Sequence, residues 1–261
     1  IRMNEIIFNE NIPSYIRQYD LKTGITVGMP WKSRTRITAH KVYFNNSDRY
    51  LNDFRLNNKD TLDITVHEGL SSGISLDNYD LDKKMYPTKG TAFSLGVKYF
   101  YDEESHQPGS SSLLNERSFT AHNWLKLKFK YEQYLPVGKK YSLGCLAEGV
   151  FSSQPVFRNY TSTLIAAPAF SPMQDSKTLF LENYRGFYYL AGGMKHVLKF
   201  NSRLQFRAEA FFFQRFNDLE PMEKEALFSV VVQNGGLGAY RAASYVVRGS
   251  YFQKKMEYMF A

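Results

Sequence analysis

The chain has 261 residues, of which 43% are hydrophobic and 16% aromatic, and its formal net charge is +8. This length suits one large all-β domain or two small domains, and no run approaches the roughly 20 apolar residues that a membrane-spanning helix needs. Mean hydropathy is slightly negative. That value does not exclude a membrane β-barrel, because barrel strands alternate lipid-facing with lumen-facing residues.

The basic residues are dispersed along the chain rather than gathered in runs. A basic protein can bind nucleic acid, anionic lipid or lipopolysaccharide. Dispersed Lys and Arg favour the interpretation that they solvate loops and a lumen, so we expect no nucleic-acid partner. The single cysteine, Cys145, excludes an intrachain disulfide framework, and we expect it to act as a small hydrophobe. Residues Ile1 to Glu5 do not form a signal peptide, so we expect a mature or trimmed piece.

Alternation of apolar and polar residues is the dominant pattern, and it predicts β-strands. From Asn123 to Leu135, apolar and aromatic residues occupy the odd positions, while Lys126, Lys128, Lys130 and Glu132 occupy the even ones. A helix would scatter both sets around its circumference. The same alternation recurs over Thr91 to Tyr101, Tyr141 to Phe151 and Arg203 to Phe212. The chain contains about ten to twelve segments of strand length and no convincing helix.

The connections between these strands are expected to alternate in length. Pro136 to Lys140 predicts a tight hairpin turn, and Phe200 to Ser202 predicts another. Glu103 to His122 and Ser152 to Arg185 are expected to be long loops. Short periplasmic turns alternating with long outer loops are typical of outer-membrane barrels. Glu220 to Leu227 is the best helix candidate and is interpreted as a loop turn.

Alternation alone also fits a soluble β-sandwich that serves as a binding module. Two further features favour a barrel. Aromatic residues gather at strand ends, as in the girdles of membrane barrels, and the opposite strand face carries dense charges of both signs, as a barrel interior does. Both interpretations remain open at this point, and detergent dependence would separate them.

Several motifs resemble one known superfamily. Tyr86-Pro87-Thr88-Lys89-Gly90 is similar to the "YPT-x-G" segment that begins a barrel strand in the outer-membrane assembly and surface-antigen superfamily. Tyr184-Arg185-Gly186-Phe187 resembles that superfamily's "[VI]-R-G-[FY]" loop motif, and a Gly192-Gly193 pair follows it. The resemblance is closest to the C-terminal barrel of Bacteroidetes patatin-like phospholipases and runs from about Tyr19 to Phe252. Further supporting segments are Gln107 to Ser110, Asn159 to Thr161, Ala167 to Pro172, Leu179 to Leu181 and Leu204 to Glu209.

This resemblance implies a transmembrane antiparallel β-barrel in the bacterial outer membrane, with sixteen strands in the family. It also implies a single barrel domain over residues 1–261, incomplete at both ends, that anchors or translocates a passenger or hydrolase domain. A second hypothesis is a phospholipid acyl hydrolase whose catalytic domain lies outside this chain. The implied partners are outer-membrane lipid or lipopolysaccharide, the protein's own N-terminal periplasmic or passenger domain, and a homo-oligomer or other outer-membrane complex.

In the superfamily the motif loop folds back into the lumen, and its arginine pairs with an acidic residue on the barrel wall. Here the resemblance assigns that loop to Arg185, Gly186 and Phe187. Alternation turns Glu209 to the same side as Arg207, which makes Glu209 the expected partner of Arg185. The alternative is that Arg185 is a surface-loop arginine.

Other motifs suggest chemistry that their context does not support. Gly69 to Gly73 spells the lipase motif G-x-S-x-G, but strand-like residues flank it on both sides and no helix follows, so a hairpin turn or bulge is expected. The five histidines show no metal-ligand spacing, and Asp77, Asp80 and Asp82 are interpreted as an acidic turn. We therefore expect no catalytic residue, metal or cofactor in this chain.

Overall fold

The computed structural model describes residues 15–32, 34–51, 61–110, 112, 116–172, 182–200, 204–220, 231–234, 242–253 and 256–260. These residues form twelve strands, one short α-helix and one 3-10 turn. In chain order the elements are β1 (Tyr15–Lys32), β2 (Thr35–Leu51), β3 (Asp63–Leu81), β4 (Gly90–Gln107), β5 (Ser118–Val137), β6 (Tyr141–Ser152), α2 (Tyr160–Ala166), η2 (Glu182–Tyr184), β7 (Tyr188–Lys199), β8 (Leu204–Arg215), β9 (Asn217–Glu220), β10 (Val231–Asn234), β11 (Ala242–Gln253) and β12 (Met256–Phe260).

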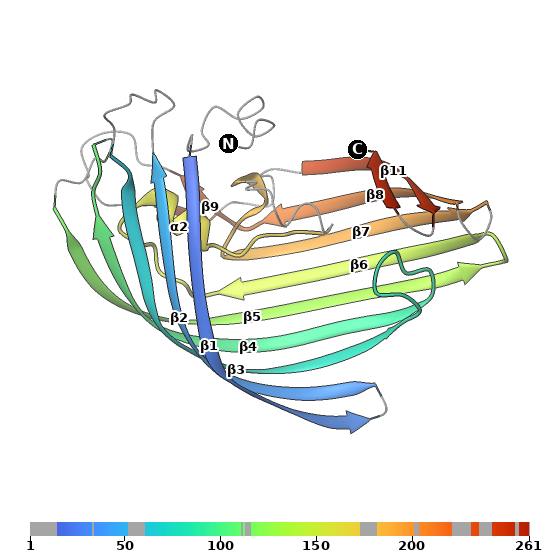
Figure 1. The fold of residues 1–261 in the computed structure, drawn as a ribbon, viewed down its shortest axis with the longest axis horizontal. Helices are drawn as coiled ribbons and strands as arrows, with labels where there is room; N and C mark the ends of the chain where they lie inside the picture. Colours follow the sequence, from blue (N-terminus) through green and yellow to red (C-terminus); the bar gives the residue numbers. More distant parts are fainter. Residues whose placement is uncertain are drawn as a thin grey trace.

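The prediction of an all-β, antiparallel fold is confirmed. Ten strands form one sheet in the order β1-β2-β3-β4-β5-β6-β7-β8-β11-β12, and β9 pairs with β10 in a small second sheet. The large sheet bends into a trough (Figure 1). It is not closed into a barrel, because within the described part of the chain β1 pairs only with β2 and β12 only with β11. No helix in the described ranges is long and apolar enough to cross a bilayer.

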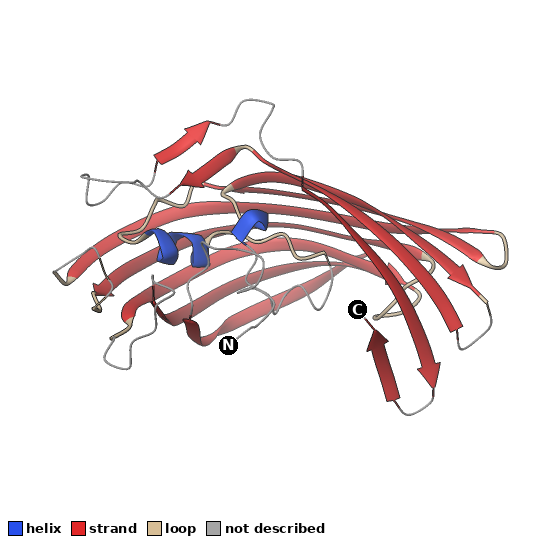
Figure 2. Cartoon of the chain, turned by 90° about the horizontal axis from the view of Figure 1, so that it is seen from above, coloured by secondary structure: helices blue, strands red, loops and turns tan. Residues whose placement is uncertain are grey.

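The two faces of the sheet differ in chemistry, as the alternation predicts. One row of the convex face consists of Ile74, Val97, Leu127 and Phe151, which are register partners on β3 to β6. All four side chains are exposed. The concave face carries the charged residues of β5, which are the even-numbered Lys126, Lys128, Lys130 and Glu132. The helical segments α2 and η2, drawn blue in Figure 2, lie inside the curve of the sheet.

The predicted turn between β5 and β6 is confirmed, but one loop is much shorter than expected. The β5–β6 turn lies between Val137 and Tyr141, with Gly138 at a φ of +77° that favours glycine. The expected loop from Glu103 to His122 is wrong at both ends, because β4 continues to Gln107 and β5 begins at Ser118. The reason is that Asp102, Glu104 and His106 alternate as concave residues with buried partners, so polar sequence here continues the strand.

Two further expectations on β3 are corrected. The G-x-S-x-G segment is neither a hairpin turn nor a bulge, since it lies in the continuous strand β3. Gly73 leaves room for a neighbour, because a Cβ there would lie 2.8 Å from Nε2 of His40. Asp77 and Asp80 also belong to β3 and do not form an acidic turn. Glu220 itself ends β9, while 221–227 lie outside the described residues. The family segment 179–181 and residues 201 and 202 of the expected turn from Phe200 to Ser202 also lie outside them.

Candidate functional site on the concave face

The segment between β6 and β7 folds back onto the concave face and carries α2. Asn159 caps this seven-residue helix, because its side-chain oxygen accepts a hydrogen bond from the Thr161 N–H at 2.8 Å. Thr161 to Ile165 are buried. A helix this short and rich in Ser and Thr has little intrinsic stability, so contacts with the sheet hold it in place.

One hydrogen-bonded chain joins α2 to the strands beneath it. Oγ of Ser162 lies 3.1 Å from Nε2 of His67, and Nδ1 of His67 lies 2.9 Å from Oδ2 of Asp102. His67 is on β3 and Asp102 is on β4. This is the order of groups in a Ser–His–Asp catalytic triad. Ser162 is fully buried, however, and the Phe157 ring packs on the His67 ring at 4.3 Å between centroids. The closed arrangement therefore acts as a latch between helix and wall and leaves no space for an acyl substrate.

A second set of wall carboxylates holds the residues that lead into α2. The Arg158 N–H donates to Oε1 of Glu104 at 2.9 Å, and His122 lies 2.8 Å from the other oxygen of that carboxylate. Asp63 accepts from Nδ2 of Asn159 at 3.5 Å and from the Gly109 N–H at 2.6 Å. Both carboxylates are buried, and donors from the folded-back loops satisfy them. The buried carboxylates at this end of the concave face thus bind the segment that leads into α2.

Arg185 belongs to the folded-back segment, and its described partners differ from the expected one. Its Nη1 donates to the carbonyls of Leu164, Ile165 and Ala167 at 3.2, 2.6 and 3.2 Å. These carbonyls end α2, where a positive charge interacts favourably with the helix dipole. Phe187 is 3% exposed and joins Leu164 and Ile165 in a core cluster with Tyr50. Gly186 is buried, and a Cβ there would lie 3.1 Å from the Arg215 side chain.

The expected pair of Arg185 with Glu209 is replaced by a pair of Glu209 with its neighbour on β8. Nε of Arg207 donates to Oε1 of Glu209 at 3.3 Å. Arg207 is 2% exposed and also donates to the carbonyl of Pro87 at 3.2 Å and to the Tyr134 hydroxyl at 3.3 Å. The arginine thus joins β8 to the β3–β4 turn, which folds inward over the sheet in Figure 1. Glu209 pairs with Arg207 because the two residues are two positions apart on one strand, which places their side chains side by side on the same face.

The same β3–β4 turn is closed by Asp82. Oδ1 of Asp82 accepts from the backbone N–H groups of Thr88 and Lys89 at 2.8 and 3.1 Å, and Oδ2 accepts from the Thr88 hydroxyl at 2.7 Å. Partial burial alone would raise the pKa of this carboxyl, but the hydrogen bonds from Thr88 and Lys89 outweigh it and lower the pKa below its ordinary value. The Tyr-Pro-Thr motif is therefore a turn, locked at one side by Asp82 and at the other by Arg207.

The latch of Ser162, His67 and Asp102 was not predicted from the sequence, although alternation carries a signal for two of its three residues. Alternation places His67 and Asp102 on the polar face of neighbouring strands, but nothing in the sequence fixes the strand register that brings them together. For the segment around Ser162, the only local sign of a helix is Asn159, a residue type that favours the N-cap position. No group of three or more His, Cys, Asp or Glu side chains within the described ranges is arranged to hold a metal ion.

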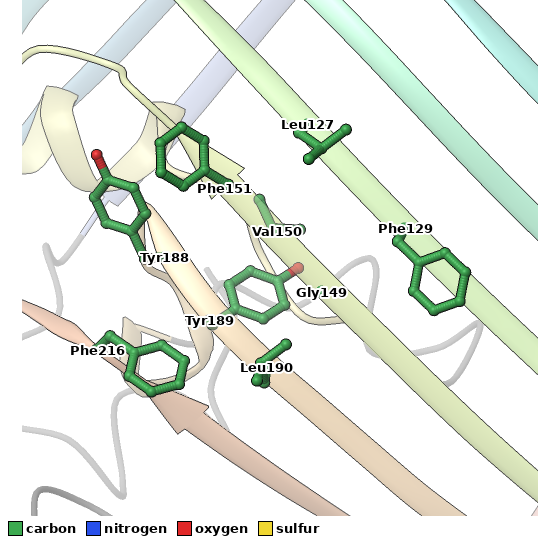
Figure 3. Close-up of a pocket in the computed structure, with 9 residues that line it drawn as sticks. All are labelled: Leu127, Phe129, Gly149, Val150, Phe151, Tyr188, Tyr189, Leu190 and Phe216. Atoms are coloured by element: carbon green, nitrogen blue, oxygen red, sulfur yellow. The ribbon is translucent and has the colours of Figure 1, made fainter. Parts of the chain in front are cut away.

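The convex side carries a shallow apolar depression of about 710 Å³ between β5, β6 and β7 (Figure 3). Gly149 lies at its centre, in register between Phe129 and Leu190, so the missing side chain leaves a gap in the row. The other lining residues are Leu127, Val150, Phe151, Tyr188, Tyr189 and Phe216. The outer surface of the sheet is thus apolar, and it is hollowed between β5, β6 and β7.

Comparison with protein-family models and with curated proteins gives no match for this chain.

Proposed function

We propose that this chain is the wall of a bacterial outer-membrane β-barrel that anchors or translocates a passenger or hydrolase domain. The observation that carries the proposal is the continuous apolar convex face of an antiparallel sheet with long strands. Exposed Leu, Val and aromatic residues occupy successive convex positions on β4 and β5, among them Leu95, Val97, Leu127 and Phe129. An exposed apolar surface of this extent marks a membrane or protein interface in a folded protein.

Strand length and edge chemistry agree with this function. β1 to β5 contain between 17 and 20 residues, longer than the roughly 9–11 that a tilted strand needs to cross a bilayer. Lipid cannot satisfy unpaired backbone groups, so a sheet in the bilayer must close on itself or on a partner. The proposal therefore requires that the complete protein close the two edges left by β1 and β12.

The concave face supports a lumen rather than a second packed sheet. It carries buried ion pairs such as Lys195 with Glu132 at 2.8 Å, and it receives the α2 segment through polar contacts. A soluble sandwich would place a second apolar layer against one face of the sheet. Here the more polar face is the one covered, and the apolar face is the one left open.

The resemblance to patatin-like phospholipase barrels extends the proposal to the parent protein. We propose that the parent hydrolyses phospholipid esters with a domain outside this chain, and that the barrel holds that domain at the outer membrane. The buried state of Ser162 agrees with a barrel that contributes no nucleophile of its own.

Migration on a gel before and after heating tests the proposal. Membrane barrels stay folded in dodecyl sulfate until heated, so the unheated chain in detergent should migrate differently from the boiled one. Leu127→Glu/Phe129→Glu, which charges the convex face, should prevent folding into vesicles. Lys139→Glu/Lys140→Glu, which introduces two carboxylates in the exposed β5–β6 turn, serves as the control. A chain that is monodisperse without detergent would contradict the proposal.

A further inference from the structure

Two lysines on the concave face oppose each other without a carboxylate partner among the described residues, and a third lysine lies beside them. Lys98 of β4 and Lys126 of β5 are direct register partners, and Lys128 is the next residue on the same face of β5. Like charges on directly opposed strand positions destabilise a sheet. Neither Lys98 nor Lys126 makes an ion pair within 4.0 Å with any described residue, whereas Lys128 pairs with Glu148. The sheet thus keeps a costly arrangement at this place.

The nearby acidic groups are already engaged by other donors. Glu148 accepts from Nζ of Lys128 at 2.8 Å and from the Tyr189 hydroxyl at 2.7 Å. Glu132 accepts from Nζ of Lys195 and from the Tyr134 hydroxyl, both at 2.8 Å. The charges of Lys98, Lys128 and Arg185 act on Lys126 with like sign, and the charge of Glu148 opposes them. An excess of positive charge therefore remains around Lys98 and Lys126.

We propose that Lys98, Lys126 and Lys128 form a binding site on the concave face for soluble multivalent anions that carry phosphate or sulfonate groups. Cross-strand neighbours are about 5 Å apart at Cβ and same-face neighbours about 7 Å apart, so three ammonium groups can reach one such anion. Lys98 is exposed, Lys126 is half-buried, and the Lys128 side chain is 43% exposed. Ammonium groups bind phosphate as strongly hydrated point charges.

This inference rests on the proposed function, because the proposed function makes the concave face the wall of an aqueous lumen. The inference adds that this lumen favours anions. A lipid headgroup has the same chemistry, but the site lies on the opposite face from Leu127 and Phe129, which would contact lipid. The site is therefore assigned to a soluble anion rather than to a phospholipid.

Fluorescence anisotropy of a trisulfonated pyrene dye, measured with the full chain in uncharged detergent micelles, tests the site. The dye should bind, bind more weakly as salt rises, and be displaced by inorganic pyrophosphate. Lys98→Gln/Lys126→Gln should weaken dye binding at least about tenfold, because charge-assisted hydrogen bonds are the strong ones. Lys139→Gln/Lys140→Gln removes the same charge in the β5–β6 turn and should change the affinity less than about twofold.

The variants also keep a failure of the site separate from a failure of the barrel. Heat-modifiable migration of each variant reports the barrel, and Lys98→Gln/Lys126→Gln should fold at least as stably as the parent because it removes a like-charge pair. Lys98→Gln alone, at an exposed position, is the second variant and should weaken binding in the same direction. Equal dye affinity in the concave and turn variants would overturn the site, as would displacement by dihexanoyl phosphatidic acid but not by pyrophosphate.

Discussion

Replacement of Arg207 by methionine removes the guanidinium that joins β8 to the β3–β4 turn, while a side chain of similar length still fills its place. The change takes the donor away from three acceptors: the Glu209 carboxylate, the Tyr134 hydroxyl oxygen and the Pro87 carbonyl. Glu209 is then a largely buried carboxylate, with its side chain 10% exposed, that has lost its ion pair.

Loss of one partner of a buried ion pair costs about 3–5 kcal/mol, because the remaining charge is left desolvated without compensation. We expect Arg207→Met to lower the free energy of unfolding by about that amount. Arg207→Met/Glu209→Gln removes the stranded charge as well, and the double variant should recover about half of the loss.

Urea titration in detergent micelles, followed by tryptophan fluorescence, measures these free energies. Arg215→Met is a suitable control, because it changes an arginine on the same strand outside the Glu209 pair. The reasoning is refuted if Arg207→Met lies within about 1 kcal/mol of the parent, the range of ordinary substitutions. It is also refuted if Glu209→Gln makes Arg207→Met less stable rather than more stable.

Three further predictions concern the turn and the folded-back segment. Asp82 has a folded-state pKa below its ordinary value of 3.8, so its contribution to stability is present above that value and is lost as pH falls through the folded pKa. Asp82→Asn should therefore lower the midpoint temperature of heat-modifiable migration at pH 7, and the difference from the parent should shrink on acidification. A difference between variant and parent that does not depend on pH would contradict this role of Asp82. Arg185→Ala removes the donor to the end of α2 and should expose residues 153–172 to limited proteolysis at least about tenfold faster, unlike Arg185→Lys, which keeps one donor; equal cleavage rates would reject this role. Ser162 is fully buried, so a fluorophosphonate probe should not label the folded chain. Labelling of the parent that Ser162→Ala abolishes would contradict this, because it would show that Ser162 becomes accessible and acts as a nucleophile.

The sheet could be predicted because its signal is local. Alternation over Asn123 to Leu135 assigns each residue to a face, and the structure keeps every one of those assignments. The same signal extends further than expected in β4, where Glu104 and His106 fall within the expected loop from Glu103 to His122 but belong to the strand. A polar strand end and a loop share a composition, and only buried partners distinguish them.

The contacts across the trough could not be predicted from alternation. His67 meets Ser162 across 95 residues of sequence, and Arg207 meets Pro87 across 120. Such contacts depend on sheet curvature and on the path of the folded-back segments, which no residue pattern encodes. The carbonyls that Arg185 meets at the end of α2 could not be foreseen, because α2 itself carries little helical signal.

Depth-dependent quenching of tryptophan fluorescence tests most directly whether the convex face lies in a bilayer. The chain has two tryptophans, Trp31 and Trp124, and Trp124 is buried on the concave face. Two single-tryptophan variants are compared in vesicles of brominated phosphatidylcholine: Trp31→Phe, which keeps Trp124, and Trp31→Phe/Trp124→Phe/Phe129→Trp, which reports from the middle of the convex face. The account predicts strong quenching of the tryptophan introduced at position 129 and weak quenching of Trp124. Equal quenching of both, or none at position 129, would contradict it.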